Sequence, residues 1–163
     1  SAENSYLQAI KLNPIFGFAY LNLANVAYHL AMEKLEKSKT EENQLINKNL
    51  EDFKHSTDQF AIPDLKKAIE YYNMALQIYP QLGFIYYNRA NLYSKMQEYM
   101  NAINDYDKAI SLQPNLAEAY YNRGLTLLLL QDSKNACPDL SKAGELGISN
   151  AYNVIKRFCS ETE

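Results

Sequence analysis

Tyr86-Tyr87-Asn88-Arg89-Ala90 opens the 34-residue pattern that decides the fold of this chain. Residues 120–124, which read Tyr-Tyr-Asn-Arg-Gly, repeat it 34 positions later. A second motif recurs at the same distance, because residues 68–72 read Ala-Ile-Glu-Tyr-Tyr and residues 102–106 read Ala-Ile-Asn-Asp-Tyr. A fixed period of this length is typical of stacked helical hairpins, since one hairpin cannot bury its apolar face alone.

A period of about 34 residues with this arrangement of aromatic residues, alanines and a final proline resembles the tetratricopeptide repeat. The resemblance covers nearly the whole chain. It implies an all-α fold, a right-handed superhelical array of antiparallel helix hairpins (a TPR α-solenoid) with a C-terminal capping helix. Small residues at Ala90, Ala102 and Ala109 allow the paired helices to approach closely, and tyrosines and leucines fill the space between repeats.

The pattern predicts a single domain over residues 1–163 and divides it into five parts. Residues 1–14 form the second helix of a truncated repeat, residues 15–82 a repeat with an insertion, residues 83–116 and 117–148 two further repeats, and residues 149–163 the capping helix and a fraying tail. The chain thus opens inside a repeat, which suggests a piece of a longer protein.

Tyr6 and Tyr72 occupy the same place in consecutive repeats, yet they are 66 positions apart instead of 34. The repeat between them therefore carries an insertion of about 32 residues, near positions 31–62. Its charges are dense, and its apolar residues keep a helical spacing. We expect the preceding helix to run past Leu35 and break near residues 38–40, with Thr40 capping an amphipathic return helix. Three interpretations of the insertion remain open: a solvated, partly disordered excursion, an arm that contacts a partner, or a helix that packs on its own array. Pro63 suits the first turn of the helix that follows.

The last repeat departs from the pattern. Leu127 replaces the tyrosine found at Tyr93, and Pro138 predicts a late start or a kink in the second helix. Gly147 closes that helix. Ser149 is placed to cap a helix over residues 150–159, and we expect that helix to turn three residues inward: Tyr152, Ile155 and Phe158.

Composition excludes several classes of function. The net charge is −3 and no basic stripe is visible, so we expect no nucleic-acid partner. The longest apolar run, residues 127–130, is too short to cross a bilayer, so no direct membrane insertion is expected. Glycine-rich phosphate loops and nucleophile motifs are absent, which argues against an enzyme and predicts no cofactor. The compartment, cytoplasm or periplasm, and the oligomeric state stay open.

Two residue types that often bind metals are rare here. His29 and His55 lie in different elements with no second ligand at helical spacing, so no metal site is expected. Cys137 and Cys159 are the only cysteines, and the helices that carry them should pack together. They could meet, as a disulfide or a thiol contact; the alternative is two buried thiols.

The resemblance places the binding surface on the first helix of each repeat, which lines the concave groove in this family. The candidates for contact with a peptide or partner are Phe18, Leu21, Asn22, Asn25, Phe84, Tyr87, Asn88, Asn91, Tyr121, Asn122 and Leu125. Tyr28, His29, Lys95, Glu118 and Leu129 lie on the same face.

Asn22, Asn88 and Asn122 occupy equivalent places and resemble the asparagine ladder of peptide-binding arrays. A carboxamide both donates and accepts, so it can pair with both groups of a peptide unit. The alternative is that these asparagines are surface residues repeated by descent. The family's carboxylate clamp is broken, because only Asn25 and Asn88 match it and its cation positions are occupied by other residues: Leu21, Glu118 and Asn122.

The sequence therefore predicts a non-catalytic protein–protein interaction module with a protein or peptide partner. Arg89 and Arg123, one place beyond the ladder, are expected to form salt bridges between helices; the alternative is that they reach a bound acid. The alternative is a structural or oligomerisation segment of a longer protein, with no peptide ligand of its own. In that case Leu125, Leu128 and Leu129 would be covered by another subunit.

Overall fold

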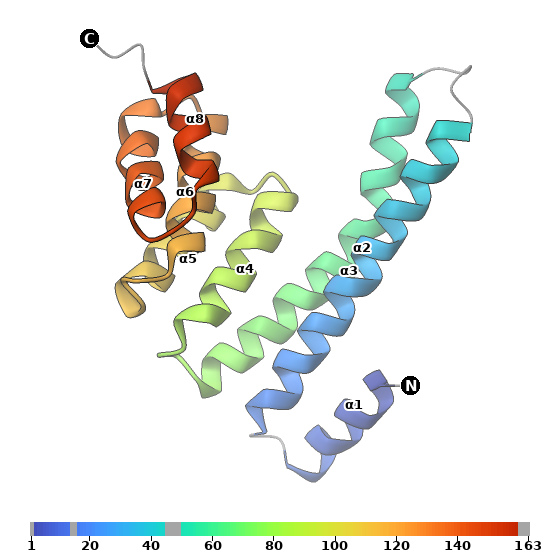
Figure 1. The fold of residues 1–163 in the computed structure, drawn as a ribbon. Helices are drawn as coiled ribbons and strands as arrows, with labels where there is room; N and C mark the ends of the chain where they lie inside the picture. The colour runs from blue at the N-terminus through green and yellow to red at the C-terminus, as the bar shows by residue number, and fades with distance from the viewer. Residues whose placement is uncertain (1, 14–15, 45–49, 160–163) are drawn as a thin grey trace. The chain divides into compact units, whose positions relative to one another are not determined.

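The computed structural model describes residues 2–13, 16–44 and 50–159; for residues 35, 38–44 and 50–61 it describes the backbone alone. The described chain is helical throughout and contains no strand (Figure 1). Its helices are α1 (Ala2–Leu12), α2 (Gly17–Gln44), α3 (Leu50–Ile78), α4 (Gly83–Lys95), α5 (Tyr99–Leu112), α6 (Ala117–Leu129), α7 (Ser133–Glu145) and α8 (Asn150–Phe158). They form two compact units, Ser1–Pro80 and Gln81–Glu163.

In the first unit, α2 and α3 form one long hairpin, and the short helix α1 packs against α2 (Figure 1). The expected break near residues 38–40 is wrong, because α2 continues without interruption to Gln44. Thr40 therefore lies inside a helix and caps none. Residues 31–44 of α2 contain neither glycine nor proline and are rich in glutamate and lysine, which favour helix. Glu33 also forms an ion pair with Lys37, one turn later in the helix (2.6 Å).

The helix that was expected to begin at Pro63 begins at Leu50, so Pro63 lies in the interior of α3. Proline removes one helical hydrogen bond but leaves the turns on either side able to continue. Asp64, the next residue, pairs with Lys34 of α2 and ties the two long helices together at this point. The described parts of the insertion are thus two helical extensions of the hairpin. The apolar side chains expected to line it, and the tail after residue 159, lie outside the described residues.

The second unit consists of the hairpins α4/α5 and α6/α7 followed by α8 (Figure 1). Three of its helices end in a turn with one residue at positive φ: Gln97 (61°), Gln131 (61°) and Gly147 (110°). In each turn the next residue's backbone N–H returns to a carbonyl five positions earlier, as from Ile148 to Ala143 (2.9 Å). Gly147 closes α7 as the sequence predicts.

The core of the second unit is built from small residues and one buried ring. Ala90, Ala102, Ala109 and Ala119 are fully buried around Tyr106, which is 1% exposed. Tyr86, Tyr87 and Tyr93 are among the partly buried residues packed against this cluster. The alanines permit the short distance between helices, and the tyrosines fill the remaining volume.

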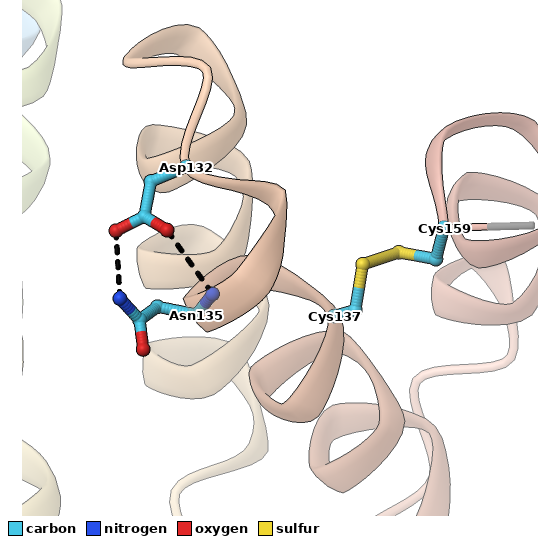
Figure 2. The surroundings of a disulfide bond; sticks show 4 residues. All are labelled: Asp132, Asn135, Cys137 and Cys159. Carbon is cyan, nitrogen blue, oxygen red and sulfur yellow. Dashed lines mark hydrogen bonds between the residues drawn. A yellow bond between two sulfur atoms is a disulfide. The ribbon is translucent and has the colours of Figure 1, made fainter. Parts of the chain in front are cut away.

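The helix α7 begins at Ser133, so Pro138 does not delay its start. Asp132 caps it: its Oδ1 accepts from the backbone N–H of Asn135 (3.2 Å), and its Oδ2 from Asn135 Nδ2 (2.7 Å) (Figure 2). Pro138 does not affect this cap, because it lies later in the helix. Since proline has no backbone N–H, the helix lacks one hydrogen bond at that point.

A disulfide joins Cys137 of α7 to Cys159, the residue that follows α8 (Figure 2). The Ser149 hydroxyl makes no capping hydrogen bond, so that expectation is wrong. On α8, Ala151 is the buried residue. Of the three residues expected to face inward, Ile155 is partly buried, the ring of Tyr152 (54% exposed) packs on Gly144 of α7, and Phe158 is half exposed (50%).

Candidate functional site

The candidate residues of the second unit lie on α4 and α6, the first helices of its two hairpins. Phe84 is 38% exposed, and Tyr87, Asn88, Tyr121 and Leu125 are partly buried. These residues combine ring surface with amide and hydroxyl groups, which suits contact with a polypeptide. Two charged residues of the same face are exposed, Glu118 on α6 and Lys95 on α4.

A hydrogen-bond network joins α4 directly to α6. Asn122 Nδ2 donates to Asn91 Oδ1 (2.9 Å) and to Tyr87 Oη (3.4 Å), and Tyr106 Oη also donates to Asn91 Oδ1 (2.7 Å). The amide nitrogen of Asn122 is therefore committed within the protein. Asn88 and Asn22 make no side-chain hydrogen bond to any described residue, so the three positions of the expected ladder are not equivalent in the structure.

The bond from Tyr106 to Asn91 belongs to a repeated structural pair. In the first unit Tyr72 Oη donates to Asn25 Oδ1 (2.9 Å), and these two residues are the counterparts of Tyr106 and Asn91. In the last hairpin both members change together, to Leu125 and Leu140. Asn25 and Asn91 are thus partners of a buried tyrosine hydroxyl, which the joint replacement in the sequence could have revealed.

The candidates of the first unit lie on α2. Phe18 is 51% exposed and packs beside Tyr79, with ring centroids 5.2 Å apart. Asn22 is exposed, and Tyr28 lies edge-on to His29 at 5.7 Å. Leu21 is only 6% exposed, so its side chain is part of the core and does not line a surface. That placement corrects the expectation for Leu21.

Arg89 and Arg123 each bind an aspartate on the second helix of the same hairpin. Arg89 holds Asp105 through two hydrogen bonds (2.6 and 2.7 Å), and Arg123 holds Asp139 in the same way (2.6 Å each). Arg123 also binds Asp107 (2.5 Å). The hydrogen bonds that Arg123 donates to Asp139 raise the pKa of Arg123 further above its ordinary value, despite burial. Both arginines therefore stabilise helix pairs, as the sequence suggested.

The burial of the Tyr72 hydroxyl can be tested through the pH dependence of stability. Burial, with a smaller contribution from Tyr28, raises the pKa of Tyr72 to about 12, whereas an exposed tyrosine titrates near 10. The folded state thus keeps a proton that the unfolded state loses, so stability is complete below pH 10 and falls as the pH rises toward 12. A shift of two units corresponds to roughly 3 kcal/mol. Urea unfolding at stepwise pH should show a shallower loss in Tyr72→Phe than in the parent; equal slopes would contradict this assignment.

No group of three or more metal-ligating side chains occurs among the residues the structure describes. His29 is exposed on α2, and the side chain of His55 lies outside the description. Within the same residues, none of the helices is both long enough and apolar enough to cross a membrane.

Comparison with known proteins places these repeats in a family. Two models of the tetratricopeptide repeat family match the chain, at residues 84–116 and 105–137. Among solved structures, "First TPR of Spaghetti (RPAP3) bound to HSP90 peptide SRMEEVD" is 22% identical, with a TM-score of 0.57 over 79% of this chain and 90% of its own. No curated protein sequence matches the chain.

Helical hairpins repeated at this period define an α-solenoid protein. Residues 84–137 match the tetratricopeptide repeat, and both family matches fall on the hairpins of the second unit. The 22% identical structure supports the fold and nothing finer. These matches point to a protein–protein interaction module rather than to an enzyme.

Proposed function

We propose that the face formed by α4 and α6 binds an extended segment of a partner protein. The observation that carries the proposal is the pair of hydrogen bonds from Asn122 to Asn91 and Tyr87, which fixes these two helices side by side. Phe84, Tyr87 and Tyr121 then share one surface, and Asn88 among them keeps its carboxamide uncommitted.

Each group on this face has a distinct role. The Asn88 amide donates to and accepts from a peptide unit of the ligand, which recognises backbone without regard to sequence. Each such bond contributes about 0.5–1.5 kcal/mol. The rings of Phe84 and Tyr121 supply the larger apolar contacts, because binding energy concentrates in a few aromatic residues. We propose the same roles for Phe18 and Asn22 on α2, whereas Asn25, Asn91 and Asn122 position their neighbours.

The ligand differs from the HSP90 peptide that is bound in the similar solved structure. A clamp for a terminal carboxylate requires cations, and the corresponding positions here hold Leu21, Glu118 and Asn122. Leu21 is buried and Glu118 is exposed with a charge of the wrong sign. The peptide SRMEEVD should therefore not bind measurably, and a neutral or basic extended segment is the expected ligand.

The test is selection of peptides from a displayed random library, followed by affinity measurements on variants. Asn88→Ala should weaken binding of the selected peptides about five- to 150-fold, as expected for the loss of two hydrogen bonds of about 0.5–1.5 kcal/mol each. Phe84→Ala should lower the affinity for these peptides about thirtyfold, which corresponds to roughly 2 kcal/mol of binding free energy. Asn104→Ala is the matched control, because Asn104 is an exposed asparagine on α5 and its change should leave affinity unchanged.

Asn122 is left intact in this design because its replacement would also break the bonds to Asn91 and Tyr87. Equal affinity of the parent, Asn88→Ala and Phe84→Ala for the selected peptides would overturn the proposal. A dimer in sedimentation equilibrium that protects α4 and α6 from hydrogen exchange would instead favour an oligomerisation segment.

A further inference from the structure

A second candidate site lies among α5, α6 and α7, and it shares no residue with the face on α4 and α6. It is an open pocket of about 390 Å³, near the lower end of the range for ligand pockets. It is lined by Ile103, Asp107, Arg123, Leu127, Asn135, Pro138 and Asp139. Three of these side chains are apolar (Ile103, Leu127 and Pro138), and the positive charge of Arg123 is already paired with Asp107 and Asp139.

The preceding hairpin contains the same arginine in a different setting. Arg89 lies over the rings of Tyr86 and Tyr93, with 5.7 and 5.9 Å from its guanidinium carbon to the ring centroids. Arg123 lies over Tyr120 at 5.7 Å, the counterpart of Tyr86. The counterpart of Tyr93 is Leu127, which lines the pocket. One of the two rings that accompany Arg89 is therefore missing beside Arg123.

We propose that this pocket binds a tyrosine side chain of a partner protein. The ring packs against Leu127 and Pro138 and lies over the guanidinium of Arg123, as Tyr93 lies over Arg89. The phenol proton is donated to Asp107, whose side chain is 54% exposed and whose carboxylate also accepts from Arg123. The partner thus supplies the ring that this repeat lacks.

The charges of the pocket favour a neutral ring over an ion. Arg123 already binds Asp107 and Asp139, so an incoming anion would meet two carboxylates. An incoming cation would meet the guanidinium. A neutral aromatic ring breaks neither ion pair, gains the attraction of the cation for its face and covers apolar surface. The hydroxyl distinguishes tyrosine from phenylalanine, because the polar side chains of Asp107 and Asn135 line the same pocket.

The experiment uses p-cresol, which is the tyrosine side chain as a free molecule, in an NMR titration of the whole chain. We expect saturable shifts of the Arg123 Nε–Hε signal and the Leu127 methyl groups, with a dissociation constant on the order of 1 mM, as for small fragments. The saturated analogue 4-methylcyclohexanol should bind at least tenfold more weakly, because it lacks the π face.

The variant Leu127→Tyr restores the missing ring within the chain and should weaken the binding of p-cresol at least tenfold. Leu129→Tyr is the matched control, since Leu129 is 61% exposed on the same helix and does not line the pocket. Ile103→Phe fills the pocket from α5 and replaces Leu127→Tyr if that variant does not fold. The absence of saturable shifts at Arg123, equal binding of the saturated analogue, or undiminished binding by folded Leu127→Tyr would each overturn the proposal.

Discussion

Replacement of Arg89 by leucine should lower the free energy of unfolding by about 3–5 kcal/mol. The change leaves the Asp105 carboxylate, whose side chain is 9% exposed, without its counter-charge and without two short hydrogen bonds. Burial disfavours the charged form of Arg89, yet the hydrogen bond and charge of Asp105 outweigh that effect and raise its pKa. Urea unfolding followed by helical circular dichroism measures the loss.

The double replacement Arg89→Leu/Asp105→Leu should recover most of that loss, because no buried charge remains. The first repeat supplies a precedent, since Leu23 and Tyr71 stand where Arg89 and Asp105 stand. Lys142→Ala is the surface control: it breaks the exposed pair with Glu145 (3.1 Å) and should change stability by less than about 1 kcal/mol. A single variant no more damaging than Lys142→Ala would show that the Arg89–Asp105 pair is energetically unimportant.

The repeat pattern predicted helices and their packing better than it predicted interruptions. Ala90, Ala102, Ala109 and Tyr106 are buried as their spacing indicates, because close helix contacts leave little choice of side-chain size. The break at residues 38–40 was wrong, since local polarity alone does not end a helix in a segment of strong helix formers. Pro63 was also misread as a start, because α3 continues through it despite the hydrogen bond that proline removes from a helix interior.

The site was predictable as a face but not residue by residue. The repeat register identified α4 and α6 as the helices to inspect, but register cannot tell whether an amide faces a ligand or a neighbouring helix. Asn88 and Asn122 are equivalent in sequence, yet Asn122 donates to Asn91 and Asn88 has no such bond. The pocket beside Leu127 depends on three helices, so a single exchange from tyrosine to leucine gave no warning of it.

Loss of the disulfide, in Cys137→Ala/Cys159→Ala, should lower the free energy of unfolding by about 3 kcal/mol. The bond closes a loop of 22 residues, and its removal returns that conformational freedom to the unfolded chain. The helix α8 has other attachments as well: Ala151 is its buried residue, the ring of Tyr152 packs on Gly144, and Asn150 Nδ2 donates to Tyr121 Oη (2.8 Å).

Because α8 packs mainly on α7, the loss should be local before it is global. Hydrogen exchange in the double variant should speed up first in α8 and only later in α7, which is packed on both α6 and α8. Reductant should bring the parent to the stability of the variant and leave the variant unchanged, which separates the bond itself from any effect of the alanines. Unchanged exchange in α8 after the bond is removed would mean that the contacts of Ala151 and Tyr152 suffice, and that the disulfide stabilises the chain only through its unfolded state.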